Sequence, residues 1–138
     1  MRFPRQYVIA LMSLLPFASA PQCGRTQEIY AGKFSEQSGE ELFTHVCQGC
    51  HMPDAKGATG AGTYPALASN PRLAAAVYPI TVVIHGQRAM PTFAEQLNDE
   101  QIANVLNYVR THFGNRYKDR ITPEQVKARR AALNAPGG

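Results

Sequence analysis

The stretch Cys47-Gln48-Gly49-Cys50-His51 decides how this chain is expected to fold. Two thiols three positions apart on one helical turn can both reach the vinyl groups of a haem and form thioethers. The residue that follows then lies under the iron, where its imidazole can serve as an axial ligand. The motif therefore predicts covalent attachment of one haem c through Cys47 and Cys50, with His51 as the proximal ligand.

Two other uses of paired cysteines remain as alternatives to haem attachment. A zinc site would need a second ligand pair of comparable spacing, and the remaining residues of these types are scattered: Cys23, His45, His85 and His112. A thioredoxin-like dithiol would need a βαβ frame, for which the sequence gives no sign. The histidine directly after the second cysteine favours haem.

Helical patterns flank the motif on both sides. Residues 39–47 read as a short helix with a capping box, in which Ser38 is the N-cap and Glu41 stands three residues on. Residues 99–113 read as a longer helix that begins after Asn98, and Gly114 is expected to end it. Its apolar residues repeat at helical spacing: Ile102, Val105, Leu106 and Val109.

The rest of the chain is expected to hold few regular elements. Residues 53–72 carry the prolines and glycines of a loop, and residues 88–97 are expected to form a loop around Met90-Pro91. A short helix is expected over 72–78 after Asn70 and Pro71. Residues 80–85 are β-branched but have no second strand to pair with, so a helix ended by Gly86 is favoured. Pro123 opens a polar helix over 124–133. We expect an all-α fold of three to four short helices, with long loops and no sheet.

Two larger patterns resemble the class I c-type cytochromes, from about residue 38 to residue 113. Gly39-x-x-Leu42-Phe43-x-x-x-Cys47-x-x-Cys50-His51 resembles the family's first helix running into its haem site. Met90-Pro91-x-Phe93, followed by Leu97-x-Asp99-x-x-Ile102-x-x-Val105-x-x-Tyr108-Val109, resembles its distal loop and last helix. The resemblance implies the cytochrome c fold wrapped around one haem, with Met90 as the distal ligand. It also implies that the carbonyl of Pro65 accepts a hydrogen bond from the proximal imidazole.

The methionines support the same distal ligand independently. Met52 is adjacent to His51, so it cannot easily reach the far face of the ring, whereas Met90 follows His51 by 39 residues in a proline-containing loop. A thioether ligand favours reduced iron, which suits an electron carrier. A methionine that fills a gap in the core and ligation by His85 are the alternatives, and His45 and His112 are expected at the surface.

The N-terminus reads as an export signal. Arg2 and Arg5 precede an apolar run over residues 7–17, and the small residues Ala18-Ser19-Ala20 follow. A buried helix of the fold and an uncleaved anchor are the alternatives. We therefore expect a periplasmic protein divided into a signal peptide (1–20), an N-terminal arm (21–37), a cytochrome c domain (38–114) and a basic C-terminal extension (115–138). No role is assigned to Cys23.

Charge is unevenly distributed along the chain. The formal charge of +4 is far below that of a nucleic-acid-binding protein. Residues 110–138 hold seven bases and two acids, whereas residues 21–109 hold five bases and eight acids. The basic end is either a solvated helix, a surface that docks on an acidic partner, or a contact to anionic lipid. Membrane contact is expected only through this end or through an uncleaved signal.

These patterns favour a one-electron carrier over an enzyme. With both axial positions filled, the iron would take no substrate. Phe113-Gly114-Asn115 and Ile121-Thr122-Pro123-x-x-Val126 resemble the ends of cytochrome subunits that serve flavin- or quinone-dependent periplasmic dehydrogenases, which implies such a dehydrogenase as redox partner and the respiratory chain as destination. A haem enzyme or gas sensor with a dissociable sixth ligand is the alternative, as is a thiol oxidoreductase that uses Cys47 and Cys50.

Overall fold

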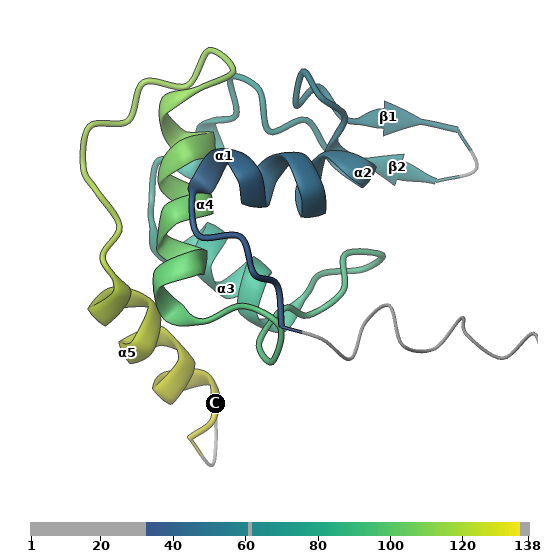
Figure 1. The fold of residues 1–138 in the computed structure, drawn as a ribbon. Coiled ribbons are helices and arrows are strands. Elements are labelled where there is room, and N and C mark those ends of the chain that lie inside the picture. The colour runs from purple at the N-terminus through teal and green to yellow at the C-terminus, as the bar shows by residue number, and fades with distance from the viewer. Residues whose placement is uncertain (1–32, 61, 136–138) are drawn as a thin grey trace, which may run out of the picture.

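The structure is a computed structural model that describes residues 33–60 and 62–135. The expected signal peptide, Cys23 and the arm up to residue 32 lie outside the described residues. The described part is mostly helical, as expected, with five α-helices, a π turn and a 3₁₀ turn (Figure 1). None of the helices within it is both long enough and apolar enough to cross a bilayer.

The first helical run is longer than the sequence pattern predicted. It consists of α1 (Gly39–Leu42), the π turn η2 (Phe43–Cys47) and α2 (Gln48–His51), which follow one another without a break. The predicted capping box at Ser38 and Glu41 is confirmed. The attachment motif is therefore the last turn of a helix and not the start of a loop.

Helix α4 (Asp99–Thr111) crosses α1 and forms the centre of the fold (Figure 1). Asn98 caps it as expected, and it ends before Phe113 and Gly114, which both have positive φ. The crossing with α1 is close, because a Cβ on Gly39 would lie 2.2 Å from the carbonyl oxygen of Asn104. The Phe43 and Tyr108 rings lie 5.9 Å apart beside the crossing.

The predicted helix over 72–78 is wrong. Asn70 does cap a turn, but this is only the 3₁₀ turn η3 (Pro71–Leu73), and the next helix, α3 (Val77–His85), begins at the end of the predicted range. Pro79 is compatible with α3 because it lies in the first turn, where the missing amide hydrogen has no acceptor to lose. Residues 80–85 are helical as predicted, and Gly86 follows with φ of 76°.

The expectation that the chain has no sheet is also wrong in detail. A small antiparallel hairpin pairs β1 (Ala58–Thr59) with β2 (Thr63–Tyr64) inside the predicted loop 53–72. Strands of two residues are too short to show an alternating pattern of apolar and polar residues, so periodicity could not predict them. The hairpin leads the chain from α2 back to Pro65.

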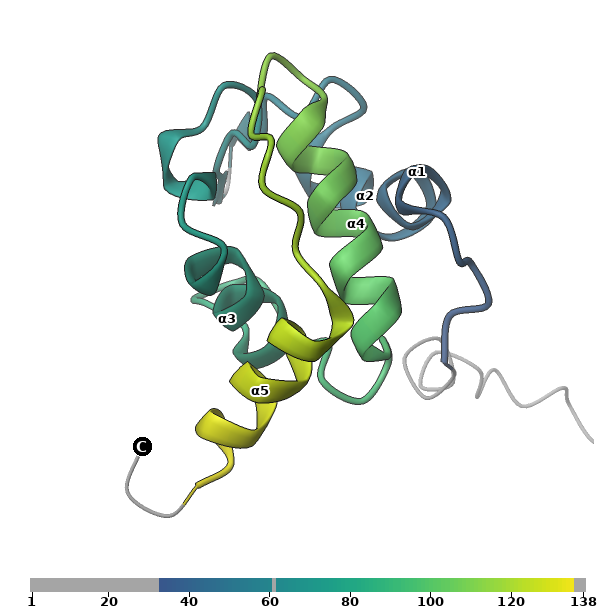
Figure 2. The same cartoon turned by 90° about the vertical axis from the view of Figure 1, so that its left-hand side faces the viewer.

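Helix α5 (Pro123–Leu133) confirms the polar helix expected near the C-terminus. It lies against α3 and α4 (Figure 2) and carries a capping box formed by Thr122 and Gln125. Val126 on α5 and Ile121 just before it are 0% and 2% exposed. The extension after residue 114 therefore packs on the core of the fold.

A single hydrophobic cluster joins all the longer helices. It includes Leu42 and Phe43 from the first run, Ile80, Val83 and Ile84 from α3, Val126 from α5, and the expected inner face of α4. Cys47 and Met90 are partly buried and pack against this same cluster. The core therefore supports both the attachment motif and the loop between α3 and α4.

Candidate functional site

The attachment motif presents its two thiols and its imidazole from one helical turn. Cys47 ends the π turn and is half-buried, Cys50 is exposed, and His51 at the end of α2 is 8% exposed. Both thiols are free. The spacing that the sequence predicts is therefore present on a regular turn of helix, as double thioether attachment requires.

A hydrogen bond to Pro65 fixes the ring of His51. The Nδ1 atom lies 3.0 Å from the carbonyl oxygen of Pro65, and since a carbonyl can only accept, Nδ1 carries the proton. Nε2 then keeps its lone pair, and among the described residues no hydrogen bond reaches it. Burial lowers the pKa of His51, although the hydrogen bond to Pro65 has the opposite effect on it. The lowered pKa favours the neutral imidazole, the form that binds a metal ion.

Gly57 allows the chain to reach this position. The amide of Gly57 donates to the carbonyl oxygen of His51 at 3.1 Å, and Gly57 has φ of 69°. A Cβ at this position would lie 2.1 Å from the carbonyl oxygen of Tyr64 and 2.8 Å from the carbonyl carbon of Pro65. Only a glycine lets the segment that ends the hairpin pass this close to α2.

Burial governs the chemistry of the Cys47 thiol. It raises the pKa of Cys47 to about 12, and the neighbouring Cys50 adds to the shift. Dithiol redox enzymes depend on the opposite effect, a lowered thiol pKa that supplies a reactive thiolate. The environment of Cys47 therefore disfavours the thiol oxidoreductase alternative.

Met90 lies on the loop between α3 and α4 (residues 86–98), which runs below α2 in the view of Figure 1. A tight turn holds it, since the amides of Gln87 and Met90 each donate to the other residue's carbonyl oxygen at 3.0 Å. Gly86 lets this turn close on α3, because a Cβ there would lie 2.7 Å from the carbonyl oxygen of Met90. No hydrogen bond among the described residues joins Met90 to the attachment motif.

The same loop is fixed to the last turn of α3. The hydroxyl of Thr92 donates to the carbonyl oxygen of Ile84 at 2.5 Å and accepts from the amide of Ala94 at 3.2 Å. The amide of Phe93 donates to the carbonyl oxygen of Val83 at 3.0 Å. Before Met90, the amide of Gly86 donates to the carbonyl oxygen of Val82 at 2.8 Å, so the loop is tied to α3 on both sides of Met90.

The rival side chains lie in other surroundings. His45 and His112 are exposed, as expected; His45 pairs with Glu36 at 2.9 Å, and His112 stacks on Tyr108. His85 is exposed at the end of α3, beside an apolar groove of about 420 Å³ between α3 and α5. Met52 directly follows His51 and is half-buried. Of the two methionines among the described residues, Met52 adjoins α2 and Met90 lies on a separate loop.

Comparison with known families gives this arrangement a name. A family model described as cytochrome c oxidase, cbb3-type, subunit III matches residues 35–109, which include the attachment motif, Pro65 and Met90. The chain belongs to the class I c-type cytochromes. Residues 35–109 therefore form an electron-transfer domain whose cofactor is haem c, bound covalently through Cys47 and Cys50.

The relatives fall into two groups, single cytochromes and the cytochrome subunits of dehydrogenases. A cytochrome c-552 of Thermus thermophilus is 32% identical over 122 residues that cover 73% of this chain and 90% of that protein. A cytochrome c6 of Diacronema lutheri is 37% identical over 82 residues that cover 56% of this chain and 95% of that protein. The fructose dehydrogenase cytochrome subunit of Gluconobacter japonicus is 32% identical over 108 residues, 67% of this chain. The cytochrome spans only 21% to 24% of the dehydrogenase cytochrome subunits that it matches.

The residues on the motif fit haem c. Two free thiols on one turn match the two thioether bonds, and the Pro65 bond leaves the lone pair of His51 Nε2 available to iron. Ile80, Val83 and Ile84 of α3 are buried in the hydrophobic cluster against which Cys47 and Met90 pack, and Val82 is partly exposed. This donor set suits iron ligation beside an apolar core.

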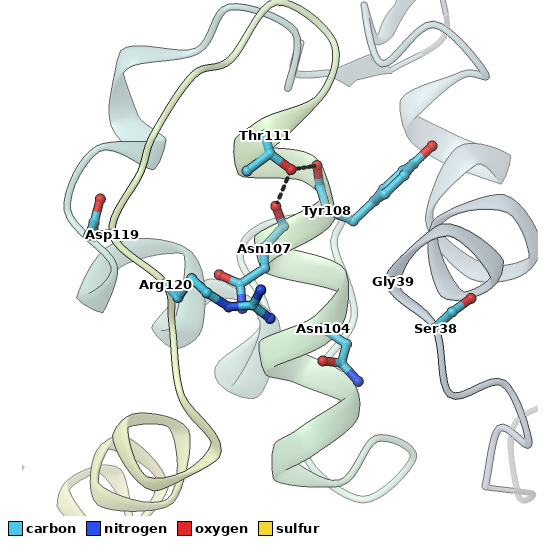
Figure 3. Close-up of a pocket in the computed structure, with 8 residues that line it drawn as sticks. All are labelled: Ser38, Gly39, Asn104, Asn107, Tyr108, Thr111, Asp119 and Arg120. Carbon is cyan, nitrogen blue, oxygen red and sulfur yellow. Dashed lines mark hydrogen bonds between the residues drawn. The ribbon is translucent and has the colours of Figure 1, made fainter.

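A polar pocket of about 360 Å³ lies at the crossing of α1 and α4 (Figure 3). Asp119 and Arg120 from the extension line one side, and Ser38 and Gly39 line the other. None of its lining residues belongs to the attachment motif. The pocket is a surface hollow apart from the haem site.

The structure divides the basic residues of the C-terminal end into two groups. Arg110, Arg129 and Arg130 make hydrogen bonds within the fold. The others are exposed and make no hydrogen bond among the described residues: Arg116, Lys118, Arg120 and Lys127. The sequence pattern led us to treat all seven as one charged surface, and the internal contacts were missed. Arg129 and Arg130 bond residues more than 30 positions away in the chain, which a local pattern does not reveal.

Proposed function

We propose that the cytochrome is a periplasmic one-electron carrier with His51 and Met90 as axial ligands. Haem c supplies the reversible one-electron change of its iron. The observation that carries the proposal is the hydrogen bond from His51 Nδ1 to Pro65, because it fixes the tautomer in which Nε2 keeps a lone pair for iron. The family match over residues 35–109 supports the same assignment.

The chain's own residues supply three contributions to this role. Cys47 and Cys50 anchor the cofactor covalently, so it cannot be lost between redox cycles. The Pro65 carbonyl makes the His51 imidazole a stronger electron donor. The tied loop brings a thioether sulfur, which raises the potential relative to a second imidazole and leaves no open position for a substrate.

Absorption spectra of the exported holoprotein, oxidised and reduced, test the ligation. We expect a low-spin ferrous spectrum of the c type, together with a ferric sulfur-to-iron band that Met90→Leu abolishes. Met52→Leu and His85→Gln are the matched controls, and both should keep the band. A high-spin spectrum that shifts readily with carbon monoxide in the wild type would instead support a haem enzyme or gas sensor.

We further propose that electrons arrive from a flavin- or quinone-dependent periplasmic dehydrogenase and leave toward the respiratory chain. Support comes from the relatives named as cytochrome c subunits of alcohol, fructose and gluconate dehydrogenases. The exposed bases of the extension offer a surface for an acidic partner.

Rates of reduction of the ferric cytochrome by such a dehydrogenase and its substrate test this partner. The rate should fall as salt is added, and it should fall at low salt when Arg116, Lys118 and Arg120 are changed to Gln. Changing the exposed acid Glu95 to Gln is the control and should not slow the reaction. A rate that ignores both salt and these substitutions contradicts docking through the extension.

The site of action is tested by expression of the full chain. Export predicts that residues 1–20 are absent from the mature protein and that haem is attached only where the attachment machinery operates outside the cytoplasm. Mass spectrometry of the purified protein measures both the new N-terminus and the added haem. Retention of residues 1–20 would favour the uncleaved anchor instead.

A further inference from the structure

Helix α5 contacts the segment that follows Met90. The guanidinium of Arg130 donates to the carbonyl oxygens of Ala94 and Leu97 at 2.6 and 3.2 Å. Its Nε also donates to the carboxylate of Asp99 at 3.0 Å. One side chain of the extension therefore bridges the end of the α3–α4 loop and the first residue of α4.

The helix that carries Arg130 is itself fixed to the core. Val126 on the same helix is fully buried, and the neighbouring Arg129 donates to the hydroxyl of Thr81 on α3 at 2.7 Å. The side chains of Arg130 and Asp99 are only 23% and 29% exposed. Partial shielding from water and a charged donor make these hydrogen bonds stronger than ordinary surface contacts.

The loop that carries Met90 is thus held at three places. The amide of Gly86, which donates to the carbonyl oxygen of Val82 at 2.8 Å, and the bonds of Thr92 and Phe93 hold it to α3. Arg130 holds the part that returns to α4, where the amide of Phe34 also donates to the carbonyl oxygen of Gln96 at 3.4 Å; both Arg130 and Phe34 lie outside residues 35–109, the part that the family model matches. Another ligand can replace the Met90 sulfur only if this loop moves, and each attachment opposes that movement.

We propose that Arg130 is a positioning residue that keeps the α3–α4 loop closed over the iron and so opposes exchange of the distal ligand. The inference rests on the proposed ligation by Met90. It gives the C-terminal extension a role within the molecule: α5 controls how readily the sixth position of the iron becomes accessible. This role is independent of which dehydrogenase donates electrons.

Titration of the ferric holoprotein with imidazole tests the proposal. Imidazole binds only the molecules in which the loop has opened, so its apparent affinity increases with the open fraction. Arg130→Gln should bind imidazole on the order of tenfold more tightly than the wild type, because it loses charge-assisted hydrogen bonds to the loop. Lys127→Gln is the matched control, since it removes the same charge from an exposed position of α5, and its affinity should not change.

Arg129→Gln separates the contact with the loop from the docking of α5. It breaks the bond to Thr81 but leaves all the Arg130 bonds in place. Midpoints of unfolding in guanidinium chloride are measured for every variant, so that loss of global stability is known. An equal rise in imidazole affinity for Arg129→Gln and Arg130→Gln would mean general loosening of α5 and would overturn the proposal. Arg130→Lys, which keeps the charge but loses the forked geometry, should give an intermediate affinity.

The wild-type spectrum distinguishes failure of the proposed Met90 ligation from failure of the proposed role of Arg130. If the sulfur-to-iron band is missing in the wild type, ligation by Met90 fails, and this inference fails with it. If the band is present and Arg130→Gln binds imidazole as the wild type does, only the role of Arg130 fails. A present band with tighter imidazole binding in Arg130→Gln alone supports both.

Discussion

The guanidinium of Arg110 is 1% exposed, and its partner across the 2.7 Å ion pair, the side chain of Asp119, is 66% exposed. The same guanidinium donates to the carbonyl oxygens of Leu73 at 2.9 Å and Ala74 at 3.1 Å. The Tyr117 ring lies 5.3 Å from its central carbon. A single buried cation therefore joins η3, α4 and the first part of the extension.

Loss of this cation should destabilise the fold strongly. Arg110→Met keeps much of the apolar stem but leaves the carbonyl oxygens of Leu73, Ala74 and Asp119 and the Asp119 carboxylate without their donor. We expect a loss of about 3 kcal/mol in the free energy of unfolding, since hydrogen bonds to charged groups contribute about 1.5–3 kcal/mol each and the released groups regain water only in part. Denaturation of the holoprotein at neutral pH measures it, with exposed Arg116→Met as control. Equal midpoints for the two variants would contradict the role given to Arg110.

The ion pair also predicts how stability depends on pH. The hydrogen bond from Arg110 lowers the pKa of Asp119 below its ordinary value of 3.8. The folded state therefore binds the carboxyl proton less tightly than the unfolded state does. The stabilisation is complete above the ordinary value and is lost as the pH falls through the lowered one.

Asp119→Asn should flatten this part of the acid unfolding curve. The variant is expected to be less stable than the wild type near neutral pH and to approach it as the pH falls below 3.8. Glu95→Gln is the control, since it removes an exposed carboxylate that makes no side-chain hydrogen bond among the described residues. A constant difference between Asp119→Asn and the wild type at every pH would rule out this linkage.

Gly57→Ala should change the reduction potential. The added Cβ has no room beside Tyr64 and Pro65, so the Pro65 carbonyl must move away from His51 Nδ1. A weaker hydrogen bond makes the imidazole a poorer donor to ferric iron, and the potential should rise on the order of 40 mV if about 1 kcal/mol is lost. Redox titration measures it. Gly62→Ala in the same hairpin meets no atom within 4 Å and should keep the wild-type potential.

Thr92→Val should loosen the loop on its α3 side. Valine has nearly the same shape but cannot donate to the Ile84 carbonyl or accept from the Ala94 amide. We expect carbon monoxide to bind the ferrous form roughly fivefold more tightly, since a neutral hydrogen bond contributes about 1 kcal/mol. Thr92→Ser restores both bonds and should restore the wild-type affinity. Identical affinities for the Val and Ser variants would show that the hydroxyl has no part in holding the loop.

Local signals in the sequence were sufficient for most of the helices. The caps at Ser38 and Asn98, the glycine after α3 and the apolar repeat of α4 each act within a few residues, so their physics is readable from the chain. The same holds for the attachment motif, whose chemistry depends on spacing within one turn. The hydrogen bond between His51 and Pro65 was predicted only from the family resemblance. In the structure, His51 Nδ1 and the carbonyl oxygen of Pro65 lie 3.0 Å apart.

Features that depend on distant partners were not predictable in this way. The bonds of Arg130 to Ala94, Leu97 and Asp99 join residues more than 30 positions apart, and nothing in the local pattern of α5 distinguishes Arg130 from exposed Lys127. The predicted helix over residues 72–78 was wrong for another reason. Asn70 as a cap with Pro71 after it favoured an early start, but these residues open only the 3₁₀ turn, and α3 starts where Pro79 falls in the first turn.

The π turn that precedes the attachment motif makes the length of this segment matter more than its composition. A π turn holds one residue more than an α turn, and each residue of a helix turns the chain by about 100°. The turn Phe43–Cys47 therefore sets the angle between the core-facing side chains of Leu42 and Phe43 and the thiols further along. Thr44 is exposed, so its replacement should be silent, but its deletion would rotate both cysteines around the helix axis. We therefore expect insertion or deletion of one residue in the turn Phe43–Cys47 to prevent haem attachment, whereas substitution of its exposed residues should not.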